Sequence, residues 1–107
     1  MSSQEHSRRH YEKHRDAIKA AVKEQKRQLA TEIKALKESK PCADCGRFFR
    51  YWVTHFDHRP GAEKVGVVSR FAANGSRIAA LAEIEKCDLV CANCHADRTH
   101  ARLQVRL

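Results

Sequence analysis

The chain has 107 residues, of which 32% are charged and 42% hydrophobic, and its formal net charge is +8 at pH 7. This length allows one small domain with an extension, and no apolar run approaches the ~18 residues that a membrane-spanning helix needs. The first residues are polar and charged, so no secretory signal is visible and we expect a cytoplasmic protein without a membrane partner. The positive charge predicts a polyanion partner, most often a nucleic acid, although a protein that is merely basic is the alternative.

Residues 1–40 favour one long helix, because they contain neither Gly nor Pro and are rich in Lys, Arg, Glu, Gln and Ala. Apolar side chains recur at steps of three and four, interrupted by one glutamine: Ile18, Val22, Gln25, Leu29, Ile33 and Leu36. We expect this stripe to pack on the rest of a monomer, with pairing between the helices of two copies as the alternative. The first half is basic and could follow a phosphate backbone, or it could simply be a solvated surface; the candidate DNA contacts are Arg8, Arg9, Lys13 and Arg15.

Pro41 ends this helix and predicts a boundary between a helical extension, 1–40, and a domain, 41–107. Aromatic and β-branched residues over 48–56 predict a strand, which the sequence Arg59-Pro60-Gly61 breaks. Residues 65–73 fit a short strand or turn passing into a helix. Ser76 favours a helix over about 77–86 with Ile78, Leu81 and Ile84 facing inward, and 88–90 reads as a short strand. A last helix should begin at about 91–94 and carry His95, Arg98 and Arg102 outward, which completes an α+β fold.

Two Cys-x-x-Cys pairs lie far apart in the chain: Cys42 with Cys45, and Cys91 with Cys94. In a reducing compartment such pairs are typical of a tetrahedral structural Zn²⁺ site, which would staple the two segments together. Redox motifs or buried thiols are the alternative. The fifth cysteine, Cys87, could compete as a ligand, but a small buried apolar residue is the favoured interpretation.

Three further side chains would converge once a metal joined the two cysteine pairs. Asp57 and His58 end the predicted strand, and His95 follows the last cysteine directly. A carboxylate oxygen and an imidazole suit a second, divalent metal, so we expect Asp57 and His95 to hold it. His58 would stay off this metal and act as the general base that deprotonates a water. Each of these histidines taken alone fits a surface or core residue better.

The sequence resembles the zinc-knuckle class of HNH endonucleases, the ββα-metal nucleases of phages, bacteria and mobile elements. The resemblance lies in three segments in this order: Phe56-Asp57-His58-Arg59, the run from Glu85 to His95, and Arg98-Thr99. The resemblance covers about residues 41–101. It implies a small ββα-metal core that hydrolyses DNA, with Zn²⁺ as the structural metal and Mg²⁺, Mn²⁺ or Ni²⁺ as the catalytic one. Because nothing in the sequence looks like a separate sequence-reading domain, we expect nicking or weakly specific double-strand cleavage. The resemblance also implies a bacterial host cell, with phage origin and membership of a larger phage or bacterial complex as options.

The pattern departs from this family in places. Lys86 stands where the family usually has an Asn, and a third ligand to the catalytic metal could be His55, Thr99, His100 or water. Arg98 could hold the scissile phosphate, with Arg59 and Arg102 as further DNA contacts, or these could be ordinary surface arginines. A zinc-dependent nucleic-acid-binding module without catalysis is the alternative function, and cleavage of RNA is a third.

Overall fold

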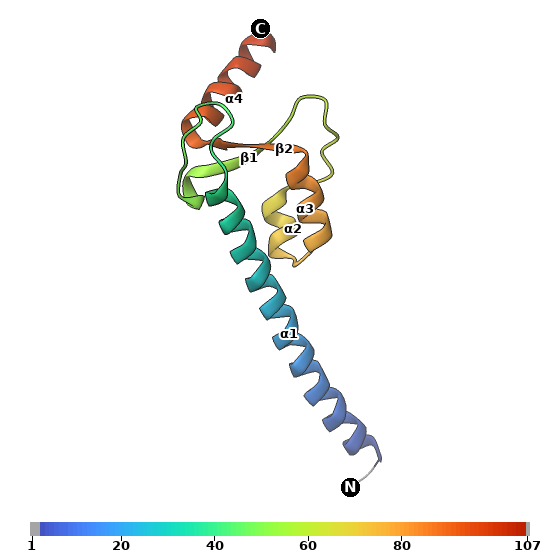
Figure 1. Ribbon diagram of the computed structural model, residues 1–107. Coiled ribbons are helices and arrows are strands. Elements are labelled where there is room, and N and C mark those ends of the chain that lie inside the picture. The colour runs from blue at the N-terminus through green and yellow to red at the C-terminus, as the bar shows by residue number, and fades with distance from the viewer. Residues whose placement is uncertain (1–2, 107) are drawn as a thin grey trace.

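The computed structural model describes residues 3–106 and consists of one long helix with a small mixed unit at one end (Figure 1). Helix α1 spans Ser3–Ser39, the single-turn η1 spans Tyr51–Val53, and strand β1 spans Thr54–His58. Helices α2 (Val68–Ala73) and α3 (Arg77–Glu85), strand β2 (Cys87–Cys91) and helix α4 (Ala92–Arg106) follow. The α+β class is confirmed. The proposed domain ranges remain predictions, and their ends, residues 1–2 and 107, lie outside the described residues.

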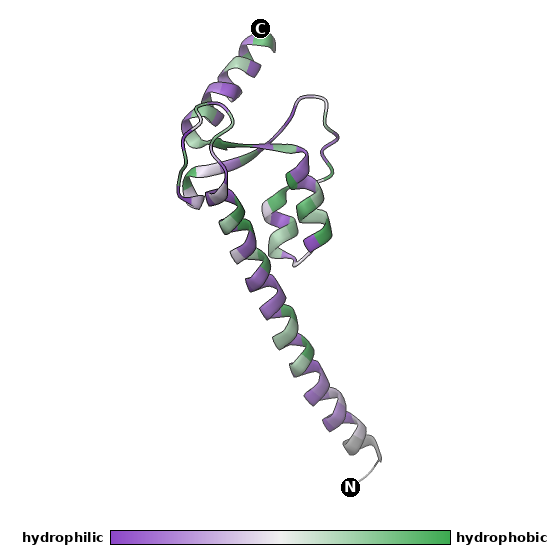
Figure 2. Ribbon diagram, in the orientation of Figure 1, coloured by the Kyte–Doolittle hydropathy of each residue, from purple (hydrophilic) through white to green (hydrophobic). Residues whose placement is uncertain are grey.

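Among the described side chains of α1, those that pack into the apolar core lie in the second half of the helix. Leu29 and Ile33 are buried against α2 and α3, and Leu36 lies at the edge of this core. Ile18 and Val22 are instead 50% and 41% exposed, because α1 projects past the other elements at this point (Figure 2). The expectation that the whole stripe packs within the chain is therefore wrong for its first half. A surface ion pair, Arg77 Nη2 to Glu32 Oε1 at 2.7 Å, also joins α3 to the packed half.

Strands β1 and β2 form an antiparallel pair in which Thr54 lies opposite Cys91 and His58 lies opposite Cys87. The predicted strand over 48–56 is wrong in its boundaries. The polypeptide makes the turn η1 first, and Glu38 Oε2 accepts the backbone N–H of Tyr51 there at 3.1 Å. The catalytic candidates therefore belong to a strand that starts at Thr54, just after this turn. Helix α4 begins at the residue after β2 and lies against both strands.

The apolar core lies in two separate clusters. The larger one joins Leu29 and Ile33 of α1 to Val68, Ala80 and Ile84 of the helical pair α2–α3. The smaller one contains the buried side chains Cys42, Val90 and Cys91, with Phe49 and Cys94 beside them. Ile78 is 87% exposed, so its predicted inward orientation is wrong, whereas Ile84 is buried as expected. None of the described helices is both long and apolar enough to cross a membrane.

Candidate metal and catalytic site

The four paired cysteines converge, with their Sγ atoms all within 4.8 Å of one another. The first pair sits on a tight turn in which Gly46 adopts φ +74° and its N–H donates to the carbonyl of Cys42 at 2.9 Å. This turn is attached to β2 by a hydrogen bond from the Ala43 N–H to the Leu89 carbonyl at 2.8 Å. The second pair spans the junction of β2 and α4. Turn, strand and helix thus bring together thiols that are far apart in sequence.

This cluster could hold a structural metal such as zinc. Four thiolates around Zn²⁺ lie ~3.8 Å apart when each Zn–S bond is ~2.3 Å, so the observed spacing needs only a small contraction. The Cys91 N–H donates to Cys42 Sγ at 3.3 Å, and the Cys94 N–H donates to Cys91 Sγ at 3.5 Å. Burial opposes ionisation of the Cys42 thiol, but backbone N–H donors outweigh it and lower the pKa to about 6. Cys87 lies outside the cluster and its thiol donates to the Glu83 carbonyl at 3.2 Å.

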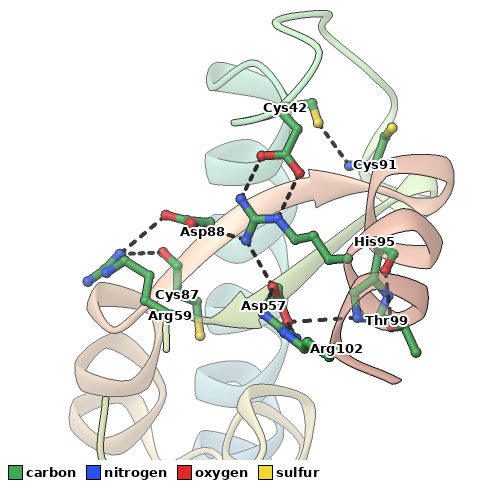
Figure 3. Close-up of polar contacts among 11 residues, drawn as sticks. Cys42, Asp57, Arg59, Cys87, Asp88, Cys91, His95, Thr99 and Arg102 are labelled. Carbon is green, nitrogen blue, oxygen red and sulfur yellow. Dashed lines mark hydrogen bonds and ion pairs between the residues drawn. The ribbon is translucent and has the colours of Figure 1, made fainter. Parts of the chain in front are cut away.

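Asp57 is buried on the α4 side of β1 and accepts hydrogen bonds from two arginines of that helix (Figure 3). Arg102 donates to both carboxylate oxygens at 2.8 and 2.9 Å, and Arg98 Nη1 donates to Oδ2 at 2.9 Å. Arg102 lowers the pKa of Asp57 most, burial raises it, and with the help of Arg98 the value becomes about 2. Asp57 is therefore an ionised carboxylate that ties α4 to the sheet.

Arg98 is a bridge among three carboxylates. Its fork binds Asp44 of the first cysteine turn at 2.6 and 2.7 Å, and its Nη1 also lies 3.1 Å from Asp88 Oδ2 of β2. Asp57 and Asp88 lie directly opposite each other in the sheet, so this guanidinium relieves a repulsion between like charges. The expectation that Arg98 and Arg102 point outward is wrong, because both side chains turn back to the sheet. Arg59 likewise donates to the Cys87 carbonyl at 3.0 Å.

His95, on the first turn of α4, lies next to Asp57, with 3.9 Å between its Nε2 and Asp57 Oδ1. Asp57 Oδ1 accepts one arginine N–H, which leaves one of its lone pairs, and this oxygen is the one nearest His95. One carboxylate oxygen and one imidazole nitrogen suit a divalent cation. Three arginines balance the three carboxylates Asp44, Asp57 and Asp88, because Arg59 Nη1 lies 3.5 Å from Asp88 Oδ1 in addition to the contacts of Arg98 and Arg102.

The side chains that could supply a third ligand, His55, Thr99 and His100, do not complete a site around Asp57 and His95. The rings of His55 and His95 are 5.2 Å apart between centroids, and burial together with the neighbouring His95 and Lys37 lowers the pKa of His55. Thr99 is turned back on its own helix, donating to the His95 carbonyl at 3.0 Å, and His100 is exposed near Gln104. Within residues 3–106, no group of three or more His, Cys, Asp or Glu ligands forms around Asp57. Water would have to complete the coordination.

His58 lies on the opposite side of β1 from Asp57, facing α3. Its Nε2 lies 2.7 Å from Oε2 of Glu83, whose carboxylate is 2% exposed. The other Glu83 oxygen accepts from Lys86 Nζ at 2.7 Å. Sequence reasoning missed Glu83, because a glutamate on a short helix carries no local sign of a partner 25 residues away. The detectable signal was its place on the inward face of α3, one residue before the buried Ile84.

A cleft of about 630 Å³ connects His58 with His95 and His55. The rest of its lining comes from α1, η1 and the segment from Lys64 to Ala73, and includes the apolar side chains of Ile33, Phe56 and Val68. Among the described residues no aspartate or glutamate lines it, whereas four lysines do: Lys26, Lys34, Lys37 and Lys64. Lys37 donates to the Thr54 carbonyl at 3.0 Å, and burial lowers its pKa. The cleft beside the histidines is thus lined by basic and apolar side chains.

The basic residues of the first half of α1 lie away from this cleft. Arg8, Arg9, Lys13 and Arg15 are exposed on the projecting part of the helix, where Arg15 has Asp16 as a neighbour at 4.0 Å. Nothing in the arrangement orients them toward His58, so a role in DNA contact stays a prediction. The lysines of the cleft were not singled out from the sequence, because they are spread over α1 and a loop and become neighbours only in the fold.

Comparison of the chain with protein-family models, with curated proteins and with solved structures gave no match. The case for each residue therefore rests on the sequence pattern and on the contacts described above.

Proposed function

We propose that this protein is a metal-dependent DNA endonuclease built on a ββα unit. The observation that carries the proposal is the convergence of β1, β2 and α4. In this unit Asp57 Oδ1 lies 3.9 Å from His95 Nε2, and His58 ends the same strand and lines the same cleft as His95. The order of the two cysteine pairs, the Asp-His pair and the following histidine is that of the HNH endonucleases. A basic cleft without acidic side chains supports a polyanionic substrate.

In the proposed reaction, His58 accepts a proton from a water molecule as the water oxygen attacks the phosphorus of a phosphodiester. A bond forms between this oxygen and phosphorus, and the bond to the 3′ oxygen breaks with its electron pair staying on the leaving oxygen. The leaving oxygen takes a proton from solvent, which yields 5′-phosphate and 3′-hydroxyl ends. Lys34 and Lys64 of the cleft are suited to hold the neighbouring phosphates.

Asp57 and His95 would hold the catalytic divalent cation, Mg²⁺, Mn²⁺ or Ni²⁺, which would supply Lewis-acid stabilisation of charge on the phosphate and the leaving oxygen. The four cysteines would hold the structural zinc. Arg98 and Arg102 orient Asp57 and fix α4, and we propose this positioning for them in place of a direct phosphate contact. A cytoplasmic setting in a bacterial host, and action within a larger complex, belong to the same proposal.

A supercoiled-plasmid assay tests the proposal directly. Purified protein with Mg²⁺, Mn²⁺ or Ni²⁺ should convert the plasmid to nicked or linear DNA, and EDTA should prevent it. His58→Ala should lose cleavage by about 10²–10⁴-fold while retaining DNA affinity. His14→Ala is the matched control, because His14 is exposed on the projecting half of α1 and should cut at the wild-type rate. Equal cleavage by His58→Ala would refute the general base.

A second candidate is a nucleic-acid-binding module without catalysis, and the acid-free lining of the cleft favours it independently of His58. Gel retardation of DNA without cutting under any of the three metals would support this candidate over the nuclease. Supplying RNA in place of plasmid DNA in the same assay shows whether the protein acts on DNA or on RNA.

A further inference from the structure

The buried carboxylate of Glu83 is not used by the reaction above, yet it contacts the proposed base directly. It is the acidic side chain on α3 that turns inward, and its two oxygens have different partners. Oε2 meets His58 Nε2 at 2.7 Å, and Oε1 meets Lys86 Nζ at 2.7 Å. Lys86 Nζ also donates to the Glu63 carbonyl at 2.9 Å, so the ammonium is anchored independently of Glu83. A buried carboxylate is costly unless it is paired in this way.

The chemistry of these groups fixes which imidazole nitrogen carries the proton. Lys86 lowers the pKa of Glu83 most, His58 contributes further, and burial opposes them, with a resulting value of about 2. At neutral pH the carboxylate is therefore ionised and can only accept hydrogen bonds. A contact of 2.7 Å with such an acceptor requires a proton on His58 Nε2. In the neutral ring the lone pair then lies on Nδ1.

We propose that Glu83 is a positioning residue that holds His58 in the Nε2–H tautomer and so makes Nδ1 the atom that accepts the proton of the attacking water. This inference rests on the proposed function for its catalytic meaning, but the tautomer itself does not depend on activity. Lys86 has a defined part as well, because its ammonium occupies the other carboxylate oxygen and fixes the orientation of the Glu83 side chain.

The contact with Lys86 makes the effect of Glu83→Gln predictable in detail. The new amide has one acceptor oxygen and one donor nitrogen. The Lys86 ammonium has only donors, so it should hold the amide oxygen and turn the amide NH₂ toward His58. An NH₂ group at His58 Nε2 needs a lone pair there, which moves the ring proton to Nδ1. Glu83→Gln should therefore reverse the tautomer, while the shape of the side chain is conserved.

A second variant separates this effect from a loss of structure. In Glu83→Gln with Lys86→Met, the amide is no longer held by the ammonium and can rotate, so its oxygen can accept from His58 Nε2–H again. The single variant should cut plasmid DNA about 10²–10⁴-fold more slowly than wild type. The double variant should recover a large part of this loss, although it differs more from the wild-type protein. Destabilisation alone predicts the opposite order.

The tautomer is measured by ¹⁵N NMR of the imidazole nitrogens at neutral pH, with His58→Ala identifying the His58 signals. Nε2–H in wild type, Nδ1–H in Glu83→Gln and Nε2–H again in the double variant are the expected results. Nδ1–H in the wild-type protein would overturn the inference without any variant. An unchanged cleavage rate in a Glu83→Gln protein with the reversed tautomer would also overturn the positioning role. If the tautomers follow the prediction and wild type cuts no DNA, the tautomer inference stands and the proposed nuclease function fails.

Discussion

Replacing Asp57 by Asn should weaken the fold as well as the proposed reaction. The Asp57 carboxyl has a pKa of about 2 where the ordinary value is 3.8, chiefly because Arg102 donates to it. A pKa below its unfolded value stabilises the folded state at pH values above about 4, and this contribution disappears as the pH falls toward 2. The difference corresponds to about 2 kcal/mol at pH 7. Asp57→Asn should lower the free energy of unfolding by this amount.

Urea denaturation at pH 7, in buffer with zinc and no other divalent cation, measures the free energy of unfolding of each variant. Asp97→Asn is the matched control, because it removes the same charge from an exposed position of α4 and should change stability by less than ~0.5 kcal/mol. The difference between wild type and Asp57→Asn should be the same at pH 6 and pH 7 and should shrink only below pH 4. An Asp57→Asn protein as stable as the control would refute the reasoning. The cost of burying the Asp57 carboxylate would then cancel its attraction to Arg98 and Arg102.

Three further outcomes are expected. Cys91→Ser should abolish binding of zinc and unfold the β2–α4 junction, seen as lost helical circular dichroism, and a folded, active variant would exclude the four-cysteine site. Leu29→Ala should cost about 2–5 kcal/mol in thermal or urea unfolding, against less than ~0.5 kcal/mol for the half-exposed Ile18→Ala; similar losses would mean that the outer half of α1 is covered in solution. Lys34→Glu should weaken DNA binding and its dependence on salt in an anisotropy titration, whereas an equal effect of Lys19→Glu would place DNA along the projecting helix instead.

The sequence predicted elements where one strong local signal acted alone. The absence of Gly and Pro before Pro41 identified α1, and the spacing of the cysteines predicted their cluster. The helical spacing of apolar residues wrongly predicted burial where the fold places no other element against the helix. Ile18 belongs to the same periodic stripe as Leu29, but no element of the described part of the chain lies beside it, and Ile78 is on an outward face of a helix of nine residues. The start of β1 was missed because aromatic residues favour a strand while the turn η1 depends on the distant Glu38.

The order of the site residues along the chain was enough to predict which of them come together. It was not enough to predict which hydrogen bonds and ion pairs they form. His95 following Cys94 was enough to expect it near Asp57, since the cysteines draw α4 toward β1. The partners of Asp57 could not be read in the same way. Arg98 and Arg102 are one turn apart on α4, so they are equally consistent with a face toward solvent and with a face toward the sheet. The buried Asp57 carboxylate, which accepts hydrogen bonds from both arginines, decides between these two orientations. Its burial depends on packing between segments more than 40 residues apart in the chain.

The separation of the two apolar clusters implies an order of events during synthesis. All five buried residues of the larger cluster lie between positions 29 and 84, so this helical half is complete before β2 is made. Cys91 follows Cys45 by 46 residues, an interval of about 2–9 s at ~5–20 residues per second. Throughout that interval the first cysteine pair offers only half a ligand set, and from the completion of β1 at His58 until β2 follows, this strand lacks its hydrogen-bonded partner. The nascent chain is therefore most exposed to mispairing and to thiol oxidation in these seconds, because the last segment to be made, β2 and the start of α4, completes both the sheet and the four-cysteine cluster.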